Sequence, residues 1–249
     1  VLLDFNEPSL LFLAVAALVL AYTVFSLVGF GSGLLASTPL AVVMPVSRVI
    51  PLLALLDCAG AAARGFRARR KVDRSELSRL LPGMLLGQVA GVGVLAWLPL
   101  QAMAVLLGAF VAIQGLRGLL RPAGSVAEGR RSPAALGVGL FGGLLGGLFG
   151  SGGFVYASYL ERRLEREAFR STQAVLIAVS TGWRVALCGL AGLIDPALLG
   201  TVLLLAPAAW AGMWLGRHLD LRLSREQLFA LLNGLLVLSG GALLLRSLG

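Results

Sequence analysis

Hydrophobic residues dominate this chain in long, nearly uninterrupted runs. The apolar stretches occupy approximately residues 8–29, 33–45, 48–63, 80–98, 101–116, 134–149, 152–160, 171–194, 197–216 and 226–245. A helix needs about 20 apolar residues to cross the roughly 30 Å hydrocarbon core of a bilayer. The pattern therefore predicts an all-α integral membrane protein with about ten helical pieces, of which 33–45 and 152–160 are short.

Composition and charge support this class and exclude others. Of the 249 residues, 58% are hydrophobic and only 13% are charged, whereas about a quarter of a soluble domain is charged. The net charge of +9 would suggest nucleic acid as the partner of a soluble protein. Because the cations gather in a few clusters without a recognisable RNA or DNA motif, we expect a lipid bilayer and no nucleic acid.

The clusters of cations predict the topology. Residues 64–79, 117–131, 162–170 and 217–225 together hold 18 of the 21 Lys and Arg residues. Cytoplasmic loops carry an excess of these residues, so we place all four segments in the cytoplasm, and Asp4, Glu7 and Asp195 outside. We expect a multi-pass protein of the cytoplasmic (inner) membrane that is targeted by its first span.

Two hairpins follow from this topology, each with a glycine-rich apex. Residues 8–45 start and finish outside, with the apex at 29–33, and residues 134–160 start and finish inside, with the apex at 150–153. A return arm of about 10 residues covers only about 15 Å as a helix. Both return arms are therefore expected to reach the middle of the membrane without crossing it.

The hairpins also reveal an internal repeat with an offset of 119 to 125 residues. Each half contains five helical pieces, and this odd number inverts the second half relative to the first. We predict one membrane domain built from a repeat at 1–120, a cytoplasmic linker at 121–133 and an inverted repeat at 134–249. The matched residues are Gly31-Ser32-Gly33 with Gly150-Ser151-Gly152, Arg48 and Gly60 with Arg170 and Gly182, and Pro82, Gly87 and Gly91 with Pro207, Gly212 and Gly216.

The two glycine breaks are candidates for an anion site. A helix that restarts inside the membrane presents unpaired N–H groups and the positive end of its dipole, and backbone leaves the helical pattern there only where protein or a cavity satisfies it. The candidate residues are Gly31, Ser32 and Gly33 in the first half and Gly150, Ser151 and Gly152 in the second. The alternative, close helix packing by small residues, is favoured for Gly87, Gly91, Gly142, Gly143, Gly146 and Gly147.

Only two ionisable residues lie far from the ends of the predicted spans. Arg184 offers a permanent charge and a planar fork of donors suited to an oxyanion, and the alternative is a buried pair with Asp57. Asp57 is a candidate for proton coupling, because burial raises the pKa of a carboxyl group. Further candidate donors to a cavity are Ser37, Thr38, Gln88, Gln173, Ser180 and Thr181.

Enzymatic functions lack their usual residues in this sequence. His218 is the only histidine, so histidine-based metal sites and Ser-His triads are not expected. The segment from Gly146 to Gly152 has no lysine, which a phosphate-binding P-loop requires. We expect no enzyme activity, no cofactor and no metal.

Several of these motifs resemble the TauE/SafE family of sulfite exporters and related anion permeases. They are Gly29-Phe30-Gly31-Ser32-Gly33 with Pro39, its repeat Phe149-Gly150-Ser151-Gly152-Gly153, and the helix start Arg170-Ser171-Thr172. The resemblance covers essentially the whole chain and implies transport of small sulfur-containing anions such as sulfite, sulfonates or thiosulfate. It adds Ser171 and Thr172 to the candidate substrate-binding residues. The first half departs from the pattern, with Arg48-Val49-Ile50 where a Ser or Thr is expected.

The function expected from the sequence is secondary transport of a small inorganic or organosulfur anion by alternating access. A passive anion channel and a membrane scaffold without transport are the alternatives. The exact anion, the direction of transport, the coupling ion and a homo-oligomeric assembly are left open by the sequence.

Overall fold

The computed structural model describes residues 8–28, 32–120, 134–218 and 225–248, and these residues are almost entirely helical. The five helices of the first half are α1 (Pro8–Val28), α2 (Ser32–Val43), α3 (Val46–Ala68), α4 (Arg74–Trp97) and α5 (Leu100–Leu120), with a short 3-10 helix η1 (Arg69–Lys71) after α3. The second half contains α6 (Ala135–Phe149), α7 (Gly153–Leu160), α8 (Arg166–Leu190), α9 (Pro196–His218) and α10 (Arg225–Leu248). The expected all-α class and the expected order of helical pieces are confirmed.

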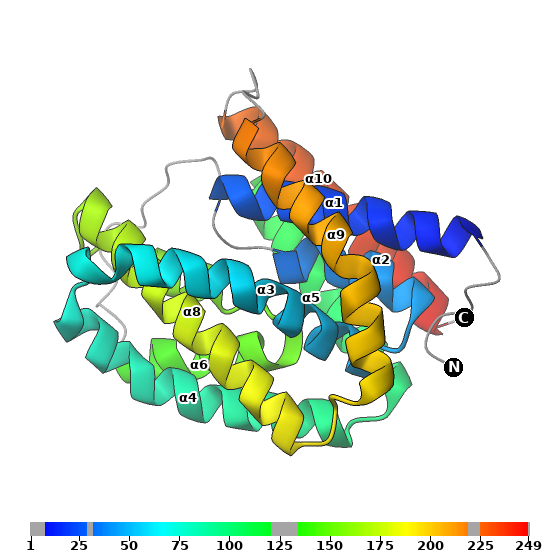
Figure 1. Cartoon of the computed structure of the whole chain (residues 1–249), viewed down its shortest axis with the longest axis horizontal. Coiled ribbons are helices and arrows are strands. Elements are labelled where there is room, and N and C mark those ends of the chain that lie inside the picture. The colour runs from blue at the N-terminus through cyan, green and yellow to red at the C-terminus, as the bar shows by residue number, and fades with distance from the viewer. Residues whose placement is uncertain (1–7, 29–31, 121–133, 219–224, 249) are drawn as a thin grey trace.

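The helices pack in a pattern that is unchanged when the two halves are exchanged. Helix α4 packs on α6, α1 packs on α9, α3 packs on α8, and α5 packs on α10 (Figure 1). If α1 to α5 correspond in order to α6 to α10, the first two contacts exchange with each other and the last two map onto themselves. This is the arrangement expected of two related five-helix repeats.

Glycines set the close contacts of α4 with α6 and of α9 with α1. A Cβ atom at Gly87 or Gly91 of α4 would collide with backbone carbonyls of α6, one turn apart. Gly212 and Gly216 of α9 make the same approach to two carbonyls of α1. Small residues at such a seam allow the helix backbones to approach closely. The packing interpretation of Gly87 and Gly91 is therefore correct, and their match with Gly212 and Gly216 holds in three dimensions.

Contacts of α3 with α9 and of α8 with α4 fix which residue of α3 corresponds to which residue of α8. Gly60 of α3 lies against the sulfur of Met213 in α9. In the other half, the Gln88 side chain of α4 donates to the hydroxyl of Ser180 in α8. Gln88 and Met213 are 125 residues apart, as are the matched glycines of α4 and α9, so Gly60 corresponds to Ser180 at an offset of 120.

The predicted match of Gly60 with Gly182, made together with that of Arg48 with Arg170, is therefore wrong by two residues. Two isolated identities between apolar helices carry little information about register, and the contacts with neighbouring helices fix it. The corrected offset makes Arg64 the equivalent of Arg184.

Both hairpins are interrupted where the glycine motifs predicted. Helix α1 ends at Val28 and α2 begins at Ser32, while α6 ends at Phe149 and α7 begins at Gly153. With 12 and 8 residues, α2 and α7 rise only about 18 Å and 12 Å along their axes. Neither return arm is long enough to cross a bilayer.

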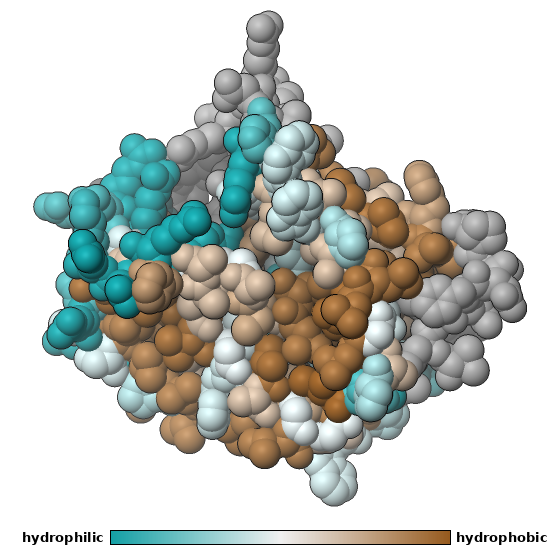
Figure 2. Space-filling model, viewed as in Figure 1, coloured by the Kyte–Doolittle hydropathy of each residue, from teal (hydrophilic) through white to brown (hydrophobic). Residues whose placement is uncertain are grey.

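Within the part of the chain that the structure describes, five helices are long and apolar enough to cross a membrane by length and composition, namely α3 continued through η1, α4, α5, α8 and α9. Hydrophilic side chains gather at the end of the molecule where α3 ends and α4 and α8 begin, and apolar side chains cover much of the remaining face (Figure 2). The chain is a multi-pass membrane protein. The gathering of polar residues agrees with the placement of segments 64–79 and 162–170 on one side.

Two basic segments, 64–79 and 162–170, differ from expectation in one respect, because they are largely helical. Helix α3 continues to Ala68, α4 already begins at Arg74, and α8 begins at Arg166. Arginine is a good helix former, and its long side chain reaches polar surroundings from an apolar helix, so a charge does not end a helix. The predicted linker 121–133 lies outside the described residues, and the division into domains stays a prediction.

Candidate functional site

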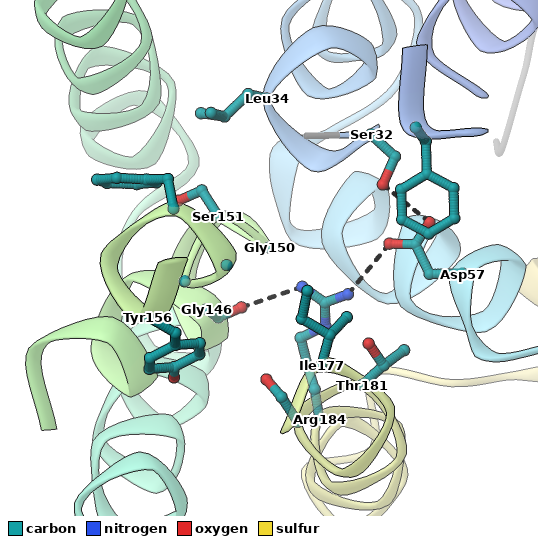
Figure 3. A pocket seen from close by; sticks show the side chains of 15 residues that line it. Ser32, Leu34, Asp57, Gly146, Gly150, Ser151, Tyr156, Ile177, Thr181 and Arg184 are labelled. Atoms are coloured by element: carbon teal, nitrogen blue, oxygen red, sulfur yellow. Dashed lines mark hydrogen bonds and ion pairs between the residues drawn. The ribbon is translucent and has the colours of Figure 1, made fainter. Parts of the chain in front are cut away.

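Residues next to the first interruption and residues of the second line a cavity of about 40 Å³ between the halves (Figure 3). Residues of α1, α2 and α3 form one wall, and residues of α6, α7, α8 and the break between α6 and α7 form the other. The lining residues are Phe25, Ser32, Leu34, Asp57, Gly146, Gly150, Ser151, Gly152, Gly153, Phe154, Tyr156, Ile177, Ser180, Thr181 and Arg184. The structure thus brings repeat-related segments from both halves to one small space.

The described parts of the two breaks are in direct contact. A Cβ atom on Gly33 would lie 2.9 Å from the carbonyl oxygens of both Phe149 and Gly150. These are backbone atoms and cannot move aside like a flexible side chain, so only glycine fits at position 33. Gly150 itself has a φ of 68°, in the left-handed region that favours glycine. The glycines are therefore needed for the geometry of the cavity.

Arg184 reaches the cavity from α8, with only 4% of its surface exposed. Its Nη1 donates to the carbonyl of Gly146 at 3.1 Å, and its Nη2 lies 3.5 Å from an oxygen of Asp57 (Figure 3). The buried Nε has no hydrogen-bond partner among the described residues. A guanidinium has five N–H donors, so Arg184 retains donors for a further group.

Asp57 faces Arg184 from α3 and is 5% exposed. Its Oδ1 accepts hydrogen bonds from the hydroxyls of Tyr22 at 2.7 Å and Ser32 at 3.0 Å, and its Oδ2 faces Arg184. A buried carboxylate needs such partners, because an unpaired charge at this depth is very costly. The buried pair of Arg184 with Asp57, which was the alternative interpretation of Arg184, is present in the structure. Both members of the pair line the cavity.

Most of the candidate site residues in the described chain come together here. Ser32, Gly150, Ser151, Gly152, Arg184 and Asp57 line the cavity, as do Ser180 and Thr181 from the list of further donors. The hydroxyls of Ser32 and Ser151 already donate to Asp57 and to the carbonyl of Leu145. Gly146 also belongs to the cavity wall and accepts from Arg184, which corrects its assignment to helix packing alone.

Ser171 and Thr172 lie elsewhere. Both are buried near the start of α8, but neither lines the cavity. The hydroxyl of Thr172 accepts a hydrogen bond from the backbone N–H of Asp73 at 2.9 Å, and so helps to hold the start of α4 against α8. The contact of Thr172 is structural in this state, and the binding role that the resemblance implies for Ser171 and Thr172 stays a prediction. Gly31 lies outside the described residues.

Arg64 is an arginine equivalent to Arg184 that the predictions from sequence did not single out. Its Nη1 donates to the carbonyl of Phe25 at 3.3 Å, three residues before the end of α1. Arg184 donates in the same way to Gly146, three residues before the end of α6. The 120-residue spacing of the two arginines is visible in the sequence, but Arg64 stands there at the start of the basic segment 64–79, which predicts a cytoplasmic position. In each half, therefore, one arginine donates to a carbonyl close to the end of the first helix of the hairpin.

Polar contacts also join the halves at both ends of the molecule. In the first turn of α3, Arg48 forms an ion pair of 2.6 Å with Asp195, which lies between α8 and α9. The amide of Leu198 and the guanidinium of Arg48 hold the pKa of the Asp195 carboxyl below its ordinary value. Beyond the other end of α3, the hydroxyl of Tyr159 in α7 donates to buried Glu76 in α4 at 2.9 Å. Asp57, which lines the cavity, lies between Arg48 and Glu76 along the chain.

Comparison with models of protein families identifies the family of this chain. The family model described as Sulfite exporter TauE/SafE matches residues 13–243. The chain belongs to the TauE/SafE family. No curated protein and no solved structure gives a match.

Membership of the TauE/SafE family implies a membrane anion transporter of the sulfite exporter type. Members of this family are transporters and not enzymes. The match runs from α1 into α10 and so includes both interruptions, Asp57 and Arg184. The expected family is confirmed.

Proposed function

We propose that this protein is a secondary transporter of the cytoplasmic membrane that moves a small sulfur-containing oxyanion, such as sulfite, thiosulfate or a sulfonate, by alternating access. The observation that carries the proposal is Arg184, a buried guanidinium with donors to spare in the wall of a cavity between the halves. A planar fork of N–H donors suits the oxygens of such an anion.

The size of the cavity supports a small substrate. One water needs about 10–15 Å³ of such volume, so the cavity of about 40 Å³ has room for a few waters or for an oxyanion of similar extent. Gly152 and Gly153 of the second break line it where α7 begins, and the start of a helix favours negative charge. A bulky organic anion would require the walls to move apart.

Alternating access is supported by the contacts between the halves. The Arg48–Asp195 pair and the Glu76–Tyr159 hydrogen bond each join a residue of the first half to one of the second. Arg48 lies in the first turn of α3 and Glu76 follows the other end of α3 along the chain, with Asp57 of the cavity wall between them in sequence. We propose that one contact opens while the other stays closed, as one half rocks against the other.

Uptake into proteoliposomes tests the proposal. Sulfite, thiosulfate, methanesulfonate and sulfate are supplied in turn, and saturation and counterflow are measured for each anion that enters. Replacing Arg184 by glutamine removes charge-assisted hydrogen bonds worth about 1.5–3 kcal/mol, which corresponds to an affinity lower by about 10–100-fold. Arg184→Lys keeps the charge but not the fork and is expected to bind less tightly than the wild type.

The matched control is Arg170→Gln, the same substitution on the same helix at an exposed position. We expect it to leave transport unchanged. Normal uptake by a folded Arg184→Gln protein contradicts the proposed binding role. Flux without saturation or counterflow identifies a passive channel, and binding of none of the anions leaves the membrane scaffold as the function.

A further inference from the structure

The carboxylate of Asp57 is the negatively charged partner of Arg184 in the proposed binding site. It accepts hydrogen bonds from Tyr22, Ser32 and Arg184, and acceptance from three donors is the pattern of an ionised carboxylate. Its distance of 3.5 Å to Arg184 is longer than the roughly 2.7–2.9 Å of a tight charge-assisted bond. The carboxylate therefore neutralises Arg184 without engaging all of its donors.

Three neighbouring helices contribute the polar and charged groups that contact Asp57. Helix α1 contributes the hydroxyl of Tyr22, α2 contributes only the neutral Ser32, and α8 contributes Arg184. On α3 itself, Arg64 lies two turns further along and acts on Asp57 from a greater distance. Among the described residues that line the cavity, Asp57 and Arg184 are the only charged ones, and together they are neutral.

An entering anion disturbs this balance. With Arg184, ionised Asp57 and a univalent anion together, the cavity would hold a net negative charge inside the membrane, where unpaired charge is strongly disfavoured. One proton on Asp57 removes the excess and leaves Arg184 paired with the substrate. The Oδ2 atom is the site for this proton, because Oδ1 already accepts two hydrogen bonds.

We infer that Asp57 takes up one proton when an anion binds to Arg184, so that the protein transports a proton together with its anion. This inference rests on the proposed anion transport. The proton comes from the water on the side to which the cavity is open and forms an O–H bond at Oδ2. It returns to water on the opposite side when the anion leaves and Asp57 pairs with Arg184 again. For a univalent anion, one transport cycle moves no net charge.

The number of protons bound per anion tests this inference directly. Binding to the purified wild-type protein is measured by calorimetry in buffers of different ionisation enthalpy. Methanesulfonate is the probe, since it keeps a single negative charge between about pH 5 and pH 9. For sulfite, its own protonation is measured in buffer and subtracted. We expect about one proton bound per anion where Asp57 is ionised in the free protein, and an affinity that rises by up to about tenfold for each unit of falling pH.

Two variants assign the proton to Asp57. In Asp57→Asn the side chain is neutral at every pH, so the anion is expected to bind with no proton uptake and no pH dependence. Ser32→Ala keeps the carboxylate but removes one of its donors, and a hydrogen bond to the charged form favours that form. It is expected to retain proton uptake and to shift the pH profile upward, an effect that a purely structural role would not produce. Glu161→Gln makes the same kind of change at an exposed residue and is the control, expected to behave as the wild type.

The outcomes separate this inference from the proposal on which it rests. Anion binding by the wild type without proton uptake across the pH range overturns the coupling and leaves anion transport intact. Proton uptake that persists in Asp57→Asn assigns the proton to another group and also overturns the inference. If no anion binds at any pH, the proposed function fails and the coupling fails with it. The wild-type measurement needs no variant, so misfolding of Asp57→Asn does not prevent a decision.

Discussion

Substituting alanine for Gly150 separates the backbone geometry of the second break from its contact with Arg184. Gly150 has a φ of 68°, where an L-residue with a side chain costs about 1–2 kcal/mol. Its added Cβ would lie 2.6 Å from Nη1 of Arg184, while ordinary contacts begin near 3.4 Å. The guanidinium therefore has to retreat by about 0.8 Å, which breaks its 3.1 Å hydrogen bond to Gly146.

Gly192 is a matched control for the strain alone. Its φ is 70°, and a Cβ there would meet nothing within 4 Å. We expect Gly192→Ala to lower the free energy of unfolding by about 1–2 kcal/mol and to leave anion binding unchanged. Gly150→Ala adds the loss of a charge-assisted hydrogen bond, about 1.5–3 kcal/mol, for a total of about 2.5–5 kcal/mol.

Unfolding in denaturant with the protein in detergent measures the stabilities, and calorimetry with the anion selected in proteoliposomes measures binding. We expect only Gly150→Ala to lose anion affinity, because only that change displaces Arg184. Equal destabilisation of the two variants, together with full anion binding by Gly150→Ala, would refute the claim that Gly150 is needed for the position of Arg184.

Two further predictions concern charged residues outside the cavity wall. Arg64→Gln removes the charged donor to the carbonyl of Phe25 and is expected to lower thermal stability while anion affinity stays close to that of the wild type; a loss of affinity as large as that of an Arg184 variant would place Arg64 in the binding site. For the Arg48–Asp195 pair, the lowered pKa of Asp195 means that its stabilisation is present above about pH 4 and is lost as the pH falls through the lowered pKa. The wild type should thus exceed Asp195→Asn in thermal stability at neutral pH, and a difference that persisted in strong acid would contradict this assignment.

Much of the fold could be predicted from the sequence, because a membrane limits what an apolar run can become. Only helices satisfy the backbone within a single run, so the ten pieces follow from length and hydrophobicity. The breaks at Gly29–Gly33 and Gly150–Gly153 were visible for a related reason, since glycine clusters interrupt the apolar runs without ending the hairpins. The ends of α3, α4 and α8 were less predictable, because arginines continue a helix beyond its apolar part.

The candidate site was only partly predictable. Arg184 and Asp57 were recognisable because charged residues are rare at such depth, and the repeat brought the two glycine breaks together. The engagement of the Ser32 and Ser151 hydroxyls depends on side-chain directions that spacing does not determine. The equivalence of Arg64 and Arg184 required the register of α3 against α9 and of α8 against α4, which is set by contacts between distant segments.

The offset of 120 residues that equates Arg64 with Arg184 also equates Asp57 with Ile177, and both side chains line the cavity. Two identical inverted halves would give inward-facing and outward-facing forms of equal energy. In the proposed alternating-access cycle, a carboxylate in one half and a hydrocarbon in the other would remove this degeneracy and give the empty protein a preference for one side of the membrane.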